Sequence, residues 1–244
     1  MIATMPANDI LRDQIDYYRA RAGEYDQWWF RTGRYDRGPQ VTERWRAEVS
    51  VVESALDVWL TERSPDTLLE LACGTGLFTQ HLARRVPRMT AVDASPEVLA
   101  LNRNRVGAAA NIEYVEADLF SWRPRTRYDA VFFSFWLSHV PDDRFAAFWD
   151  TVAAALAPDG AAYLIDSAFD PSSMAKDHVV PRPDAEIVTR KLNDGREFRI
   201  VKRFWEPQAL GMRLRALGWS AAIAQTPSYF IHGTAQRGAD YSDE

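Results

Sequence analysis

The residues best placed to do chemistry follow three successive apolar segments of the chain. Gly74 and Gly76 come after the first segment, Asp93 ends the second, and Asp118 follows the third. Glycine allows a ligand to approach the backbone closely, and a carboxylate accepts hydrogen bonds from hydroxyl and amino groups. Asp93 is therefore suited to bind a ribose diol, and Asp118 to accept a hydrogen bond from the exocyclic amine of adenine.

Each of these features also has a purely structural explanation. A glycine pair is ordinary turn chemistry, and Asp93 or Asp118 alone is more often a helix cap. Their occurrence at successive strand ends favours a shared ligand, because the carboxyl ends of parallel strands meet at one edge of a sheet.

The elements that position these residues alternate between short apolar runs and amphipathic stretches, which is typical of βαβ units around a parallel sheet. We expect strands at 67–71, 89–92, 112–115, 130–133 and 161–165. Helices are expected from the glycine turn to Arg85, from Pro96 to Val106 and over about 142–156, with a helix stop at 157–160.

The two ends of the chain differ from this alternating middle. The stretch from Tyr17 to Trp45, inside a mostly helical region, is rich in Tyr and Trp. Near the other end, Asn193-Asp194-Gly195 is a strong hairpin signal. The elements expected around it are strands at 186–192 and 197–205, a helix at 207–217 and a strand pair at 219–224 and 229–233.

Composition and charge exclude several classes of protein. With 244 residues, 47% apolar and 26% charged, the chain is typical of globular proteins. A formal charge of −5 disfavours nucleic-acid and anionic-lipid partners, and the single Cys73 excludes an internal disulfide. The apolar stretch 130–140 is too short to span a membrane. We expect a soluble, cytoplasmic monomer or homodimer.

Two further charged features are expected to be unremarkable. Arg123, Arg125 and Arg127 form a short basic run that suits a solvated loop better than an RNA site, given the acidic remainder. Asp142 and Asp143 lack metal-ligand spacing with histidine, so no metal is expected.

Four segments resemble class I S-adenosylmethionine-dependent methyltransferases, in particular those of small molecules. They are ELACGTG (70–76), AVDASPEVL (91–99), VEADLF (115–120) and YDAVFFSFWLSHVP (128–141), and the resemblance covers about residues 17–235. It implies S-adenosylmethionine as cofactor, bound by Tyr18, Tyr25, Glu70, Ala72, Gly74, Gly76, Asp93, Ala94, Asp118, Leu119 and Ser134. In the family, the residue at Glu70 organises the loop, the Gly74–Gly76 turn passes the methionine moiety, and Asp118 with Leu119 contacts adenine.

One position departs from the family pattern. Ala72 stands where many members have a glycine, and its small side chain is expected to keep the turn open.

The competing ligand is NAD, but its fingerprint needs a third Gly or Ala near Thr79. Glu70 would also repel a pyrophosphate, so S-adenosylmethionine is favoured.

The expected fold is α/β, with a Rossmann-like, seven-stranded, mainly parallel sheet, helices on both faces and one domain overall. Its expected parts are an N-terminal helical lid with the first core helix (1–60), the cofactor-binding core (61–170), an insertion with a β-hairpin (171–205), and a final helix with a closing strand pair (206–244).

The acceptor side is predicted from three features. His139 is the best candidate for a base, because neutral imidazole accepts a proton near pH 7; its alternative is a turn cap. Tyr18 and Tyr25 are expected to face the cofactor from an aromatic lid, the alternative being core packing. Arg199 and Lys202 are available for an acidic acceptor group, the alternative being a solvated strand face.

Together these features predict methyl transfer to a small, apolar or aromatic acceptor, in the first instance on oxygen. Transfer to sulfur or nitrogen, and a cofactor-binding module without turnover, are the alternatives that the sequence leaves open.

Overall fold

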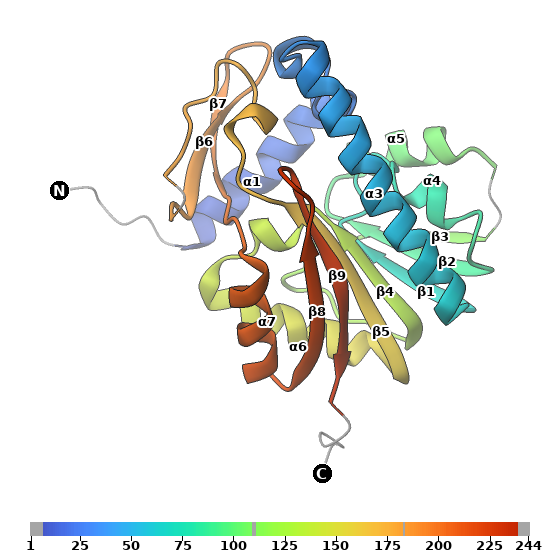
Figure 1. Ribbon diagram of the computed structural model, residues 1–244. Helices are drawn as coiled ribbons and strands as arrows, with labels where there is room; N and C mark the ends of the chain where they lie inside the picture. The colour runs from blue at the N-terminus through green and yellow to red at the C-terminus, as the bar shows by residue number, and fades with distance from the viewer. Residues whose placement is uncertain (1–6, 109–110, 183, 239–244) are drawn as a thin grey trace.

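One seven-stranded sheet runs through the computed structural model, which describes residues 7–108, 111–182 and 184–238 (Figure 1). The strand order is β3-β2-β1-β4-β5-β9-β8. The strands are β1 (Thr67–Leu71), β2 (Arg88–Asp93), β3 (Ile112–Glu116), β4 (Tyr128–Ser134), β5 (Leu156–Ser167), β8 (Trp219–Gln225) and β9 (Phe230–Arg237). The neighbouring strands β3, β2, β1, β4 and β5 are parallel, and β9 is antiparallel to β5 and β8. The predicted Rossmann-like, mainly parallel sheet is confirmed.

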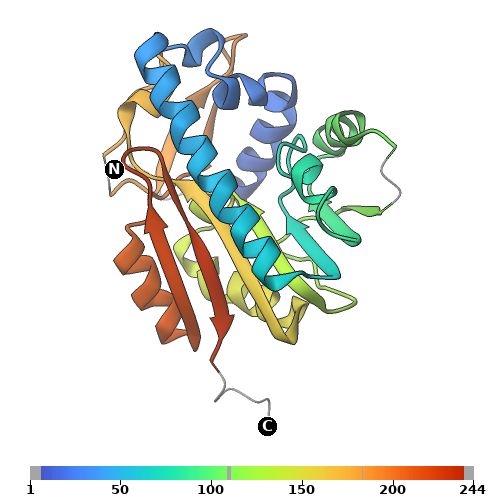
Figure 2. The same ribbon diagram turned by 45° about the vertical axis from the view of Figure 1, so that its right-hand side comes forward.

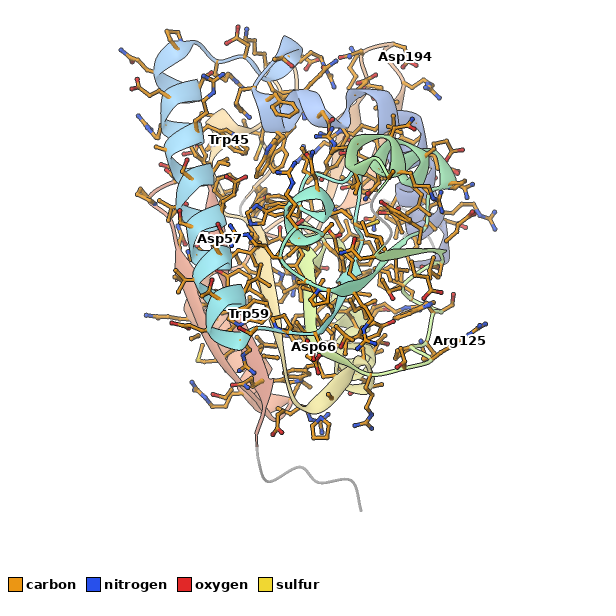
Figure 3. All side chains as sticks on the ribbon, turned by 90° about the vertical axis from the view of Figure 1, so that its right-hand side faces the viewer. Trp45, Asp57, Trp59, Asp66, Arg125 and Asp194 are labelled. Atoms are coloured by element: carbon orange, nitrogen blue, oxygen red, sulfur yellow. The ribbon has the colours of Figure 1, made fainter. Side chains whose placement is uncertain are left out.

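Helices cover both faces of this sheet. They are α3 (Pro39–Arg63), α4 (Thr79–Leu82), α5 (Pro96–Val106), α6 (Phe145–Ala155) and α7 (Pro207–Ala216). Leu69 and Val131 pack with α6 and α7, whereas their neighbours Leu68 and Ala130 pack with α3 and α4. Both faces of the central strands are therefore buried, which explains why β1 and β4 are mostly apolar, whereas the edge strand β3 is only partly buried. Trp45 and Trp59 belong to the buried side of α3 (Figure 3).

The remaining elements lie at the carboxyl end of the parallel strands, at the top of Figures 1 and 2. They are α1 (Ala7–Arg21), α2 (Tyr25–Phe30) and the hairpin formed by β6 (Ile187–Lys191) and β7 (Glu197–Val201). Tyr17 of α1 packs with Val188 and Ile200 of the hairpin. The N-terminal helix and the hairpin before α7 are therefore confirmed, and they enclose the space above the sheet edge.

Several predicted boundaries were wrong; strand β9, for example, extends to Arg237 rather than to residue 233. Helix α4 ends at Leu82 rather than Arg85, and residues 83–85 continue as a turn in which the Arg85 and Val86 amides both donate to the Leu82 carbonyl. Residues 157–160 belong to β5, through an irregularity in its pairing with β4. Glycine at position 160 permits this irregularity, because any other residue would place a Cβ 3.0 Å from the Tyr128 carbonyl oxygen.

The hairpin also ends earlier than predicted. Strand β7 stops at Val201 rather than Trp205, because the chain then turns toward the loop after β4, where the Arg203 amide donates to the Ser138 carbonyl at 2.8 Å. The four-part division of the chain stays a prediction.

Candidate active site

The turn after β1 forms the floor of the site. Ala72 has φ +51°, Gly74 φ +56° and Gly76 φ +89°, so the left-handed conformation recurs along the turn. This explains why a glycine suits the position of Ala72. A Cβ on Gly76 would lie 2.8 Å from Cγ of Asn102, so Gly76 is needed for close packing against α5.

Asp93 connects this turn to the next strand end. Its Oδ2 accepts a hydrogen bond from the Gly74 amide, and its Oδ1 accepts one from the Ser95 amide, both at 3.0 Å. Burial raises the pKa of Asp93, while these amides act in the opposite direction. Each carboxylate oxygen keeps lone-pair capacity for a further donor, as binding of a diol requires.

Glu70 lies beneath the turn and is 1% exposed. Burial raises its pKa to about 8, and its Oε2 has no hydrogen-bond partner among the described residues. Glu70 and Gly76 do not line the cavity above the turn, so any role of theirs is exerted through the loop.

A cavity of about 780 Å³, counting its open mouth, lies above the turn; we call it the first cavity. It brings together most of the predicted cofactor residues: Tyr18, Tyr25, Ala72, Gly74, Asp93, Ala94, Asp118, Leu119 and Ser134. Its ionisable lining includes Asp93 and Asp118 but no Lys or Arg. A sterically open, acidic site of this kind suits a cationic ligand with hydroxyl and amino donors.

A second cavity of about 560 Å³ adjoins the first, beneath α1 and the hairpin. Tyr18, Tyr25, Phe135 and His139 line both cavities and form the wall that they share. Phe135 directly follows β4 with φ +52°, a conformation that a bulky residue rarely adopts. Its amide donates to the Ile165 carbonyl at 2.8 Å, which helps to hold that conformation at the junction.

His139 in the shared wall is held by two hydrogen bonds. Its Nδ1 lies 2.6 Å from the Val201 carbonyl oxygen, which can only accept, so Nδ1 carries the proton. Its Nε2, 2.7 Å from the Tyr18 hydroxyl, therefore accepts from Tyr18. Burial, with the nearby Lys202 charge, lowers the pKa of His139 well below its usual value, so the imidazole is neutral at pH 7.

The second cavity is cationic. Its lining includes Arg21, Arg190 and Lys202, and no Asp or Glu. Lys202 lies 3.8 Å from the Asp166 carboxylate behind the lining, and burial lowers the pKa of Lys202 to about 8.

Two of these three cations, Arg21 and Arg190, were not predicted from the sequence. Of the hairpin candidates, Lys202 lines the cavity, whereas Arg199 lies 3.7 Å from Asp13 on the other side of β7.

The sequence pattern does contain a signal for Arg190 and for Arg21. Arg190 alternates with Val188 and Leu192, which places it on the buried face of β6. Arg21 lies one helical turn beyond Tyr18. The contribution of α1 to the first cavity, through Leu11, Gln14 and Ile15, was also missed.

Charged features expected to be unremarkable lie away from the cavities. Arg123, Arg125 and Arg127 are exposed, and Figure 3 shows Arg125 at the outer surface. Within residues 7–108, 111–182 and 184–238, no group of three His, Cys, Asp or Glu side chains could hold a metal ion. In the same ranges no helix is long and apolar enough to cross a membrane.

Known proteins resemble this chain in sequence and in fold. Residues 68–160 match a family model described as a methyltransferase domain. The solved DhpI-SAM-HEP complex is 38% identical, with a TM-score of 0.75, over 95% of this chain and 100% of that chain. The DhpI-SAH complex is 37% identical, with a TM-score of 0.71, over 96% of this chain and 100% of that chain.

Curated relatives match a smaller part. Trans-aconitate 2-methyltransferase of Streptomyces avermitilis is 31% identical over 172 residues, which are 67% of this chain and 61% of that protein. Malonyl-(acyl-carrier protein) O-methyltransferase 1 of Ilyobacter polytropus is 23% identical over 101 residues, 40% of this chain and 38% of that protein. The chain thus matches less than two thirds of these two relatives. The likeness to DhpI, however, spans nearly the whole chain, and with it the chain belongs to the class I S-adenosylmethionine-dependent methyltransferases.

Proposed function

We propose that this protein transfers the methyl group of S-adenosylmethionine to an oxygen atom of a small molecule. The observation that carries the proposal is the pair of adjoining cavities with one shared wall of four side chains. A donor in the first cavity and an acceptor in the second would meet at that wall, away from bulk water. Such alignment is the main contribution that a protein makes to a displacement reaction.

The first cavity is proposed to hold the donor. Asp93 would bind the ribose diol, Asp118 and Leu119 the adenine, and the turn at Gly74 the methionine moiety. Ala72, Ala94 and Ser134 would complete this surface, with Tyr18 and Tyr25 closing it from α1 and α2. The absence of Lys and Arg from the lining supports this assignment, because the donor carries a sulfonium.

The second cavity is proposed to hold the acceptor. When bound, S-adenosylmethionine supplies a methyl group whose C–S bond breaks as the C–O bond forms, leaving S-adenosylhomocysteine. Trp28, Phe135 and Phe204 line the second cavity, which supports the expected apolar or aromatic part of the acceptor. The solved complex of DhpI with both SAM and HEP supports a two-ligand site of this kind.

The role of His139 as base stays a prediction. The position of its ring adds the condition that the proton must pass through the Tyr18 hydroxyl. Since Nε2 accepts from the Tyr18 hydroxyl, a proton from the acceptor would reach His139 through Tyr18. Tyr18 oxygen would take the acceptor proton while its own proton moves to Nε2. The lowered pKa keeps His139 neutral and able to accept a proton at pH 7, so this relay serves an acceptor oxygen that still carries its proton and is not needed for one that is already ionised.

The test is the release of S-adenosylhomocysteine with a panel of carboxylic acids, phosphate monoesters, phenols, thiols and amines. Turnover with an oxygen acceptor is expected. Turnover with thiols or amines alone would favour the alternatives of sulfur or nitrogen methylation. Tight binding of S-adenosylhomocysteine without turnover on any member would favour a non-catalytic cofactor-binding module. The absence of nucleic-acid, membrane and metal partners, the oligomeric state and the cytoplasmic location stay predictions.

A further inference from the structure

We propose that the second cavity contains a binding subsite for a compact oxyanion, a carboxylate or phosphate group, formed by Arg190 and Arg21 with Lys202 beside them. The inference rests on the proposed function, because the oxyanion would be the charged group of the acceptor. It adds the chemical class of acceptor, which neither the first cavity nor the fold specifies.

The strongest evidence for this subsite is the buried, unpaired guanidinium of Arg190. The residue is 8% exposed, and its Nη1 is buried without a hydrogen-bond partner. No salt bridge to Arg190 occurs among the described residues. A buried guanidinium is costly unless it is paired and hydrogen-bonded. A ligand oxyanion in the second cavity would supply the missing acceptors, and a guanidinium presents two parallel N–H groups that match the two oxygens of such a group.

Arg21 is held in place by aromatic rings rather than by an acid. Its guanidinium carbon lies 4.8 Å from the Tyr25 ring centroid and 5.5 Å from that of Tyr17. Its Nη2 donates to the Tyr35 hydroxyl at 3.1 Å. These contacts orient the guanidinium, but they come from two aromatic rings and a hydroxyl rather than from a carboxylate.

Lys202 differs from the two arginines. Its ammonium donates to Ser138 Oγ at 2.8 Å and to Ser167 Oγ at 3.2 Å, and Asp166 lies 3.8 Å away. Asp166 therefore compensates one positive charge of the cluster. The charges of Arg21 and Arg190 remain, which suits an anion rather than a neutral polar group.

Arginines near the two cavities but outside their linings provide a comparison. Arg34 lies 3.1 Å from the Asp177 carboxylate, and Arg105 pairs with Asp26. Buried Arg31 instead donates to the Ser172 and Ser173 carbonyls. Among the described residues, no carboxylate forms a salt bridge with Arg21 or Arg190. This difference favours a binding site for an acidic ligand. It argues against an arginine pair that is merely solvated or purely structural.

The experiment measures binding of two simple probes to the protein saturated with S-adenosylhomocysteine. Inorganic phosphate and succinate are titrated separately at constant ionic strength, with chloride as the balancing salt, and the unfolding midpoint is followed. We expect at least one probe to raise the midpoint in a saturable manner. The stronger probe identifies the phosphate or the carboxylate source.

Arg190→Gln is expected to weaken binding of that probe by about 10- to 100-fold, as the loss of charged hydrogen bonds implies. The matched control is Arg196→Gln, on the same hairpin but outside the cavity, with a side chain that is 57% exposed. The control should bind the probe like the unaltered protein. Arg190→Gln should keep the affinity for S-adenosylhomocysteine, which shows that it is folded; if it does not fold, Arg21→Gln takes its place.

Two results overturn the inference. One is that neither probe shifts the midpoint of the unaltered protein; the other is that the cavity variant binds the probe as tightly as the control. Failure of the proposed function looks different, because the unaltered protein would then either not bind S-adenosylhomocysteine or bind it without turnover on any oxygen acceptor. The probe titrations can still be run on the protein alone in that case, and their outcome still decides the inference.

Discussion

The two cavities differ in charge although they share a wall. The first is lined by Asp93 and Asp118 without a cation, and the second by three cations without a carboxylate. On our proposals, a cationic donor and an anionic acceptor each meet complementary charge and are repelled from the other's cavity. Methyl transfer would cancel the sulfonium charge and one negative charge of an ionised acceptor oxygen together. The same contrast that selects the substrates would therefore weaken the binding of both products.

The largest effect is expected at the shared wall. His139→Ala should lower kcat by about 10²- to 10⁴-fold for a hydroxyl acceptor, because a general base typically contributes this much. For an acceptor oxygen that is already ionised, no proton is removed, and the loss should stay below about threefold. Steady-state kinetics with one acceptor of each kind measures the difference.

The pH profile provides a check on the same residue. Since the lowered pKa keeps His139 neutral, the ascending limb of kcat for a hydroxyl acceptor should lie well below pH 6.5 and vanish in His139→Ala. A drop of less than about threefold with a phenol of high pKa would exclude His139 as the base. Tyr18→Phe is the matched variant, because it removes the hydroxyl that links His139 to the acceptor.

Beneath the first cavity, Glu70→Gln should change the pH dependence of stability. The pKa of Glu70 is about 8 in the folded protein against 4.5 when exposed, so the folded state holds the extra proton between these values. Stability therefore falls as pH rises from 4.5 to 8. Glutamine cannot ionise, and above pH 8 the variant should be more stable by up to about 5 kcal/mol, because each unit of pKa difference corresponds to about 1.4 kcal/mol. Denaturant unfolding at pH 5 and pH 9 tests this; an equal difference at both values contradicts it.

Asp93→Ala should separate the two cavities. Loss of the ribose partner is expected to weaken S-adenosylhomocysteine binding by about 1–3 kcal/mol. Binding of phosphate or succinate in the second cavity should be unchanged, the reverse of the pattern for Arg190→Gln. Calorimetry with each ligand on both variants gives the four values. Equal losses of both ligands in both variants would mean that the cavities do not act as separate sites.

A smaller effect is expected where α2 contacts the glycine turn. Asp26 accepts a hydrogen bond from Thr75 Oγ1 at 2.7 Å and pairs with Arg105 of α5. Asp26→Ala should loosen α2 over the first cavity and weaken S-adenosylhomocysteine binding by about 0.5–1.5 kcal/mol. An affinity equal to that of the unaltered protein would show that this contact does not hold the first cavity closed.

The sequence predicted the features that depend on local pattern. Gly74, Asp93 and Asp118 could be placed at one sheet edge because each follows an apolar strand, and the rule for parallel sheets brings such positions together. The Asn193-Asp194-Gly195 turn was predictable for the same reason, since its residue types favour one local geometry.

Features that depend on long-range packing could not be read in this way. The Tyr18–His139 hydrogen bond joins residues 121 positions apart, and nothing near either residue indicates it. The burial pattern places Arg190 inward, but the absence of an acid partner becomes visible only when α1 is packed on the hairpin. For His139, the sequence indicated a base, whereas packing determines its tautomer and lowers its pKa.

The most direct test of the central claim is calorimetric titration of the unaltered protein with S-adenosylhomocysteine, alongside NAD. We predict saturable heat for one molecule of S-adenosylhomocysteine per chain, and none for NAD. No heat with S-adenosylhomocysteine, together with tight binding of NAD, would contradict the assignment of the first cavity and the proposed function with it.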